Sequence, residues 1–552
     1  MVVAPTADMA RQKQELILAM TDGHAEYLRD ESRSVGRGES ISFPTCEEDV
    51  ICIMQEMHRL ETSVTVQGGR TGLAAGAVPY GGHIMNMLRM NGVTGLRQDD
   101  DGCFYIRVQP GMALSRMRKL LENKRFANAG FDAASQQAFA AFREAPEQFF
   151  PTDPTESSAT IGGIVACNAS GARSYLYGPA RPYIQGVRLV LCDGLTLALQ
   201  RGEVLATGRL LELTTEQGSH IQVPLPAYSM PKVKNASGYY AADDMDAIDL
   251  FIGSDGTLGI ITEIELKLLP LPSIIWGVSC FVEQNEQAID LVIKVRQQMT
   301  QVASMEYFNA DAFAVLRRQK QLSSVFAQLP DIPARYAAAI YFELHCESET
   351  TALACLDTLS SLMVQVGADP ENTWVARTAA DLDRLHFLRH AAPESVNMLI
   401  DARKKEDPII TKLGTDMSVP DQHLHFIMKT YREMLAERDL QSALWGHIGD
   451  NHVHVNILPR DAADYYRGKE LYTEWSKLVT SLGGAVSAEH GVGKLKAEYL
   501  VIMYGEENVA DMAATKAALD PLALLGVGNL FSVDLVHHAA ALQADHSGED
   551  RL

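Results

Sequence analysis

Two short segments in the second half of the sequence carry most of the residues that could do chemistry. Residues 446–459 read GHIGDNHVHVNILP, and residues 487–493 read SAEHGVG. Imidazole nitrogens and carboxylate oxygens are ligands that Zn or Mn accepts, and a neutral imidazole can also take up a proton. We therefore expect a divalent metal site with a general base beside it.

The elements around these residues must bring them together. From His452 onward polar and apolar residues alternate, which predicts a strand with His452, His454 and Asn456 on one face. A spacing of seven positions would put His447 and His454 on opposite faces of an unbroken strand. The sequence GDN at 449–451 favours a turn, which can bring His447 back to the same face. The glutamate and histidine of SAEHGVG would approach from a separate, glycine-bounded segment.

Other interpretations of these residues remain open at this point. A single histidine is more often a hydrogen-bonded core or surface residue than a ligand, whereas the whole set favours chemistry. A metal-dependent hydrolase would use the same two imidazoles and one carboxylate with an open position. That alternative leaves the glycine-rich half of the sequence unexplained.

Glycine concentrates at residues 68–82, 162–194 and 253–259. This density costs conformational entropy and favours places where the backbone approaches a ligand. The sequence GGRTGL at 68–73 follows a predicted strand and can form a backbone nest for a diphosphate, although a plain tight turn also fits. No G-x-G-x-x-G opens a helix with an acidic residue about 20 positions later, which disfavours a Rossmann NAD fold.

Taken in order, GGRTGL, DPTESSATIGG, NASGARSYLYG and GSDGTLGIITE resemble the FAD-binding domain of the vanillyl-alcohol oxidase and p-cresol methylhydroxylase (PCMH) superfamily over roughly residues 40–270. The resemblance implies FAD with its diphosphate on 68–73 and its isoalloxazine bordered by 153–171 and 257–261. No His or Cys stands at the tethering positions, so we expect non-covalent FAD. The implied FAD-binding residues are Gly68, Gly69, Arg70, Thr71, Gly72, Leu73, Asp153, Pro154, Ser158, Thr160, Gly162, Gly163, Asn168, Ser170, Gly171, Tyr177, Thr257, Gly259, Ile260 and Ile261. Arg70 replaces a frequent third glycine, which leaves its placement open.

The two histidine-bearing segments resemble the C-terminal domain of the FAD-linked D-2-hydroxyacid dehydrogenases, which include D-lactate, glycolate and D-2-hydroxyglutarate dehydrogenases. This resemblance implies that His447, His454 and Glu489 hold the metal, that Asn456 contacts substrate, and that His490 is the catalytic base. The common form is GDGNLH, whereas this chain has GDNHVH. His452 is thus an additional candidate ligand, ranked below His454.

The same resemblance implies a reaction and two substrate-binding cations. Arg389 and Lys412 would bind carboxylates, although each could equally be a solvated charge, and the spacing from Lys412 to Asp416 is longer than in the relative considered. The expected activity is oxidation of D-lactate to pyruvate, metal-assisted, with a hydride passing to flavin N5. Glycolate and D-2-hydroxyglutarate are the alternative substrates.

Composition limits the partners. A net charge of -22 disfavours nucleic acid. The eight cysteines form no C-x-x-C pair, which disfavours an iron-sulfur cluster, so electrons would leave to an external quinone, cytochrome or electron-transfer flavoprotein. A passive electron-carrying subunit is disfavoured because the His-Glu set is complete. Without a basic leader or an 18-residue apolar run, we expect a cytoplasmic protein with no transmembrane segment, with peripheral contact to the inner face of the membrane left open.

The predicted fold class is α+β: a PCMH-type FAD-binding domain followed by an α+β substrate or cap domain with an antiparallel sheet. We expect a helical lead-in at 1–45, the FAD-binding domain at 46–272, the cap domain with the metal site at 273–500, and a segment at 501–552 returning to the FAD domain. Helical spacing of Val50, Ile53, Met54 and Met57 predicts an amphipathic helix. Residues 120–150 suggest a helical insertion.

Overall fold

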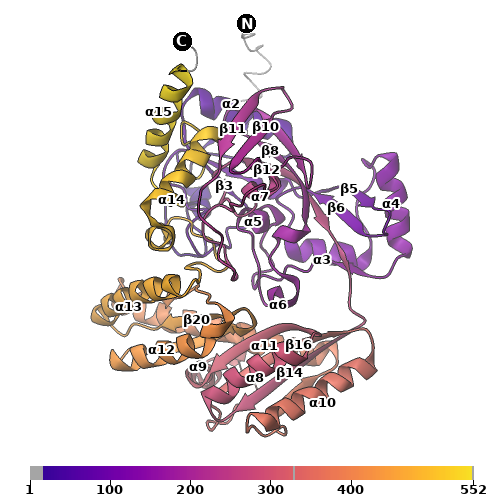
Figure 1. Ribbon diagram of the computed structural model, residues 1–552, viewed down its shortest axis with the longest axis vertical. Helices are drawn as coiled ribbons and strands as arrows, with labels where there is room; N and C mark the ends of the chain where they lie inside the picture. The colour runs from indigo at the N-terminus through magenta and orange to yellow at the C-terminus, as the bar shows by residue number, and fades with distance from the viewer. Residues whose placement is uncertain (1–15, 327–329, 550–552) are drawn as a thin grey trace.

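The computed structural model describes residues 16–326 and 330–549. Figure 1 shows an upper part built from the first half of the chain and a lower part built around one large sheet, with the C-terminal helices lying beside the upper part. Within the described residues, none of the helices combines the length and apolar character needed to span a membrane.

The upper part opens with a four-stranded sheet in the order β1-β2-β4-β3. Helix α2 (Glu47–Arg59) connects β2 to β3, and its four predicted apolar residues are buried, which confirms that prediction. Strands β2, β4 and β3 are parallel, and β1 is antiparallel to β2. The strand bounds are Leu18–Ala19 for β1, Ser40–Ser42 for β2, Val64–Gln67 for β3 and His83–Asn86 for β4.

The expected helical lead-in is wrong for residues 17–45. Leu16 is helical, but the described residues from 17 to 45 contain two strands and a 3-10 helix, η1 (Asp22–Leu28), and no α-helix. Strand β2 is hydrogen-bonded to β4 and β1, and this pairing outweighs local helix propensity. Residues 1–15, on which the rest of that prediction depends, lie outside the described residues.

A five-stranded antiparallel sheet in the order β5-β6-β12-β8-β9 completes the core of the upper part. Its strands are β5 (Val93–Gln98), β6 (Phe104–Val108), β8 (Ile184–Val190), β9 (Thr196–Gln200) and β12 (Ile260–Lys267). The short pairs are β7 (Gln148–Phe149) with β13 (Leu269–Pro270), and β10 (Leu210–Thr214) with β11 (His220–Pro224). The helices are α3 (Leu114–Asn123), α4 (Ala133–Glu144), α5 (Ile161–Ala166), α6 (Ser174–Tyr177) and α7 (Ile248–Phe251). Helix α4 lies in the stretch where a helical insertion was predicted.

The lower part is a seven-stranded antiparallel sheet in the order β17-β14-β16-β15-β19-β20-β18. Its strands are β14 (Ile274–Val282), β15 (Val302–Asn309), β16 (Ala338–Cys346), β17 (Thr373–Ala376), β18 (Leu413–Gly414), β19 (Ser442–His447) and β20 (His452–Ile457). Its helices are α8 (Asn285–Gln298), α9 (Ala310–Leu322), α10 (Glu349–Gln365), α11 (Ala379–Glu406), α12 (Leu424–Glu437) and α13 (Ala462–Ser481). This sheet confirms the antiparallel cap sheet that the sequence predicted.

The two faces of this sheet are covered differently, and the difference positions the site. Helices α8, α10, α12 and α13 pack on one face through a large apolar core, while α9 and α11 cover part of the other through a smaller one. Alternation along β20 puts Val453, Val455 and Ile457 in the large core. His452 and His454 therefore point to the opposite face, the one shared with Trp445 of β19.

The C-terminal segment returns to the upper part (Figure 1). Helix α14 (Ala497–Leu519) contacts β11, and α15 (Val533–Glu549) packs on α14. The buried ammonium of Lys516 donates to the carbonyls of Thr257 and Leu525, and Leu525 forms a β-bridge with Val64. The segment from Lys516 to Leu525 is thus tied to β3 and to the loop before β12. The four domain limits themselves stay a prediction.

Candidate functional site

A hairpin brings the first histidines together. Strand β19 ends at His447, the 3-10 turn η6 (Ile448–Asp450) follows, and β20 begins at His452, which pairs directly with His447. Asn451 closes the turn in a left-handed conformation, with φ of 52°. The predicted turn and the predicted face of β20 are confirmed.

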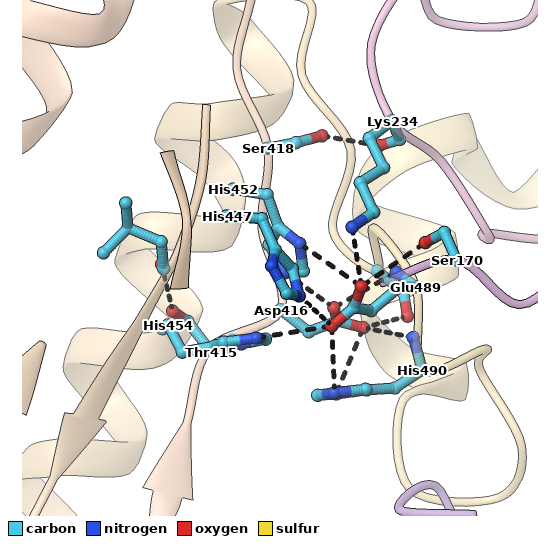
Figure 2. Close-up of polar contacts among 12 residues, drawn as sticks. Ser170, Lys234, Thr415, Asp416, Ser418, His447, His452, His454, Glu489 and His490 are labelled. Carbon is cyan, nitrogen blue, oxygen red and sulfur yellow. Dashed lines mark hydrogen bonds and ion pairs between the residues drawn. The ribbon is translucent and has the colours of Figure 1, made fainter. Parts of the chain in front are cut away.

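Glu489 is the centre of the cluster (Figure 2). Its Oε1 lies 3.1 Å from His447 Nε2, 3.4 Å from His454 Nε2 and 3.7 Å from His490 Nε2. The other oxygen, Oε2, accepts from Lys234 Nζ at 2.6 Å and from Ser170 Oγ at 3.3 Å. Lys234 and Ser170 belong to the upper part, so one carboxylate joins the two parts of the chain.

A second buried carboxylate, Asp416, holds the segment that carries Glu489 and His490. It accepts the backbone N–H of Glu489 at 3.2 Å and that of His490 at 3.0 Å. It also accepts from Ser487 Oγ and from Lys496 Nζ, each at 2.6 Å. The side chain is fully buried. Burial opposes its ionisation, but His490 and Lys496 hold its pKa well below the usual value.

The imidazoles differ in charge state. Burial alone would lower the pKa of His447, yet the carboxylates of Glu306 and Glu489 outweigh it and raise that pKa to about 9. For His490 burial dominates and lowers the pKa to about 4, although Asp416 acts in the other direction. His490 is therefore a neutral acceptor at pH 7, and its ring stacks on that of His454 at 5.3 Å.

Three residues of this cluster were missed from the sequence. Glu306 on β15 accepts from His447 Nδ1 at 2.6 Å, Lys234 binds Glu489, and Asp416 anchors the 487–490 segment. Lys234 stands in VKNASGYY, whose small residues resemble the other ligand-approaching segments and could have signalled it. Glu306 is the carboxylate of the buried strand β15. A charged residue in such a strand is unusual and is itself a signal.

The structure brings one of the three predicted substrate residues into this network. Arg389 on α11 is buried and its Nε lies 3.5 Å from Glu306 Oε2. Asn456 Nδ2 instead donates to backbone carbonyls of its own hairpin, at Ala443 and His454. Lys412 precedes β18, where Gly414 pairs with Asn456. Burial and the neighbouring charge of Arg33 lower the pKa of Lys412 to about 8.

The predicted FAD-binding loops lie against one another. A Cβ on Gly68 would fall 2.1 Å from Thr160 Oγ1, and one on Gly69 would fall 2.8 Å from the carbonyl of Ser158. One on Gly171 would overlap the carbonyl of Asp153. Close packing of backbone therefore requires these glycines, and it joins the first loop to the second.

Other residues of the predicted FAD set form hydrogen bonds, an ion pair or apolar contacts with residues of the protein itself. Tyr177 Oη bonds His345 Nδ1 at 2.7 Å, Asn168 Oδ1 accepts the backbone N–H of Arg181, and Thr257 Oγ1 bonds Tyr239 Oη. Ile260 is buried in an apolar cluster. Asp153 pairs with Arg118 at 2.7 Å. The remaining predicted members lie on or next to these loops: Thr71, Gly72, Leu73 and Pro154 on the loops themselves, Gly162 and Gly163 in the first turn of α5, Gly259 just before β12, and Ile261 in β12.

Unpartnered polar atoms on these loops fit an anionic cofactor. Arg70 stacks on Tyr27 and pairs with Glu26, yet its Nη1 is buried without a hydrogen-bond partner among the described residues. The hydroxyl of Thr152 is in the same condition. Buried donors normally have partners, and a diphosphate beside Arg70 would supply acceptor oxygens. The loops are thus suited to a ligand such as FAD.

The cluster around Glu489 also fits a metal ion. His447, His452, His454 and Glu489 each offer a ligand atom, and these atoms lie within 4.8 Å of one another. The chemistry of the set, imidazole nitrogen with one carboxylate oxygen, suits Zn. The predicted ligand roles of His447, His454 and Glu489 stay a proposal.

Comparison with family models places both halves of the chain. Residues 272–530 match the model described as FAD linked oxidases, C-terminal domain. Residues 39–138 and 134–200 match the FAD binding domain model.

Similar proteins extend over nearly the whole chain. A D-lactate dehydrogenase from Anaerostipes hadrus is 25% identical over 95% of this chain and 97% of its own length. The glycolate oxidase subunit GlcD of Bacillus subtilis (strain 168) is 24% identical over 90% and 89%. A D-2-hydroxyglutarate dehydrogenase from Stutzerimonas stutzeri (strain A1501) is 25% identical over 94% and 96%.

Solved structures show the same fold. p-Cresol methylhydroxylase with substrate bound superposes with a TM-score of 0.64 at 12% identity, covering 96% of this chain and 98% of that one. 4-Ethylphenol oxidase from Gulosibacter chungangensis gives 0.63 at 14% identity, covering 96% and 99%. At these identities the likeness concerns the fold alone, and it confirms the predicted α+β class with a PCMH-type domain.

The role of Asp416 generates a stability prediction. Asp416→Asn should lower the free energy of unfolding by about 3–5 kcal/mol, because the ammonium of Lys496 is left buried without its counter-charge. Urea unfolding with an unchanged m-value measures this change. Glu474→Gln, which removes an exposed ion pair with Arg438, is the control and should change the same quantity by less than about 1 kcal/mol. Equal effects of the two substitutions would contradict the anchoring role.

Proposed function

The chain belongs to the FAD-linked oxidase family, as its motifs predicted, and from this premise we propose that it is an FAD-dependent dehydrogenase of small D-2-hydroxy acids. D-lactate, oxidised to pyruvate, is the favoured substrate, with glycolate and D-2-hydroxyglutarate as alternatives. The names of three relatives that match nearly end to end support this substrate class.

The observation that carries the proposal is the meeting of two sets of residues. Glu489 lies among the imidazoles and accepts a hydrogen bond from Ser170, which belongs to one of the predicted flavin-bordering segments. A hydroxy acid held at this cluster would therefore lie next to the segment expected to border the isoalloxazine. A metal-dependent hydrolase would not need a flavin-bordering segment beside its metal site.

The two groups that the residues fit would supply different chemistry. FAD, held non-covalently by the loops around Gly68 and Thr160, supplies the hydride acceptor. A divalent ion, Zn or Mn, held by His447, His454 and Glu489, supplies Lewis acidity toward the hydroxyl and carboxylate oxygens of the substrate.

The chain's own residues would bind the acid and move its proton. His490 is neutral, partly exposed and held by Asp416 through its backbone, so its Nε2 can accept the hydroxyl proton. Arg389, with its planar fork, and the ammonium of Lys412 are suited to carboxylates. The electrons would then pass to an external quinone, cytochrome or electron-transfer flavoprotein, and we place the protein in the cytoplasm.

The substrate class can be tested by anaerobic bleaching of the flavin. The purified yellow protein should lose its visible absorption with D-lactate and not with L-lactate, because one face of the α-carbon must point at the hydride acceptor. Glycolate, D-malate and D-2-hydroxyglutarate complete the screen, each with and without a chelator. A colourless protein that cannot be reconstituted with FAD would refute the proposal.

The role of His490 gives a second test. His490→Gln should lower turnover by about 10²- to 10⁴-fold, the usual contribution of a general base, while the bound flavin is retained. Stopped-flow measurement of flavin reduction isolates this step. His425→Gln, at an exposed histidine of α12, should reduce at the wild-type rate. If His490→Gln keeps that rate as well, the base lies elsewhere.

Lys412 gives a prediction with opposite effects on stability and binding. Its pKa is about 8 in the fold and 10.5 otherwise, so between these values the unfolded chain binds more protons and stability rises with pH. Below pH 8 the side chain is charged in the folded protein as well, so its burial lowers the free energy of unfolding by the full amount. Lys412→Met should therefore stabilise the ligand-free protein at pH 7 by about 1–3 kcal/mol.

The same substitution should raise the KM for the hydroxy acid, because the carboxylate loses a cation. Thermal unfolding without substrate and steady-state kinetics measure the two effects. Lys429→Met removes an exposed lysine of α12 and should change neither. Destabilisation by Lys412→Met would show that this ammonium has a partner in the folded protein.

A further inference from the structure

We propose that His452 is a third imidazole ligand of the metal, so that this chain holds its ion with three nitrogens and one oxygen. The inference rests on the proposed function, since it concerns the same metal. It goes beyond the ligand set of His447, His454 and Glu489 that the family resemblance implied, in which His452 was ranked last.

The first argument is that each of the three rings has an acceptor near the nitrogen that faces away from Glu489; Figure 2 shows the three rings beside this carboxylate. Two of them direct one nitrogen outward to an acceptor: His447 Nδ1 to Glu306 Oε1 at 2.6 Å, and His454 Nδ1 to the carbonyl of Thr415 at 2.9 Å. His452 Nε2 lies 3.0 Å from Asp416 Oδ1, within reach of such a bond, although the ring orientation does not give it hydrogen-bond geometry. Metal-bound imidazoles almost always have such an outer acceptor, which fixes the tautomer and the ring.

The second argument is the direction of the remaining nitrogens. His447 Nε2 and His454 Nε2 face Glu489 Oε1 at 3.1 and 3.4 Å, and His452 Nδ1 faces Glu489 Oε2 at 3.9 Å. All four ligand atoms lie within 4.8 Å of one another, a spacing that an ion between them could close. His452 thus faces the same carboxylate as the two expected histidines, through its other oxygen.

The third argument is that His452 has no other use for its inner nitrogen. The side chain is 0% exposed, and among the described residues neither ring nitrogen has a partner with hydrogen-bond geometry. A buried polar atom left unsatisfied carries a cost in stability. Coordination of an ion by Nδ1 would remove this cost and would orient Nε2–H toward Asp416. An apolar residue would be the better choice at this position if it served packing alone.

A ligand set with three imidazoles has a consequence for the identity of the metal. Imidazole nitrogen favours Zn over Mn, whereas carboxylate and water oxygens suit Mn. The set therefore selects Zn²⁺ from the two ions that the sequence left open.

The test uses the FAD-loaded protein stripped with a chelator and titrated with Zn²⁺ and, separately, Mn²⁺ against a chromophoric competitor. Loss of an outer-shell partner costs about 10- to 100-fold in metal affinity, so loss of a direct ligand should exceed about 100-fold. His452→Gln, which keeps a polar atom near Asp416 but offers nothing at the Nδ1 position, should weaken Zn²⁺ binding by at least that factor. His83→Gln removes another buried imidazole, bonded to Ser40 and Ser42 away from the cluster, and should leave Zn²⁺ affinity unchanged.

X-ray absorption at the zinc edge reports the number of imidazole ligands. In the wild-type protein this result does not depend on whether a variant folds. Wild-type protein should show three imidazoles, and His452→Gln two, with the flavin content of both unchanged. Two imidazoles in the wild type, or equal Zn²⁺ affinity in His452→Gln, would overturn the role of His452 while leaving the proposed metal site in place. A wild-type protein that binds neither ion would instead contradict the metal part of the proposed function.

Discussion

The site depends on buried negative charge that is held by hydrogen bonds before any ligand arrives. Asp416 accepts two backbone N–H groups, a serine hydroxyl and an ammonium, all inside the protein. A carboxylate in such surroundings stays ionised because its oxygens accept four hydrogen bonds, one of them from an ammonium. The positions of Glu489 and His490 follow from it, since their backbone is fixed by the same side chain. The chemistry of the cluster is thus preorganised by a residue that is itself inaccessible.

The site also exists only where the two parts of the chain meet. Glu489 and the imidazoles come from the lower part, but the second oxygen of Glu489 is held by Lys234 and Ser170 of the upper part. Because Ser170 sits in a segment expected to border the flavin, the interface between the parts also sets the distance between the two centres. Movement of one part against the other would alter Glu489 first. This explains why the segment carrying Glu489 is followed by α14, which returns to the upper part and is tied there by Lys516.

Patterns of short range could be predicted from the sequence. Helix α2, the turn at 449–451 and the face of β20 each follow from periodicity or turn chemistry within about ten residues. The sequence could not predict contacts made across the fold. The segments of Lys234 and Glu306 carry weak signals in the sequence, but only the packing of distant segments places these residues beside Glu489 and His447. The lead-in failed for the same reason, since β2 is a strand because β4 lies next to it.

The charges of the site explain why an anion would enter a protein of net charge -22. Glu306, Asp416, Glu489 and the nearby Asp450 carry four negative charges, against three positive charges on Lys234, Lys496 and Arg389. The pKa of His447, raised to about 9, adds a proton at pH 7 and brings this count to zero. A divalent ion that replaced this proton would leave one positive charge in surroundings that water screens poorly. That single excess charge matches one carboxylate, so the loaded cluster would attract a monoanionic hydroxy acid locally although the protein as a whole repels it.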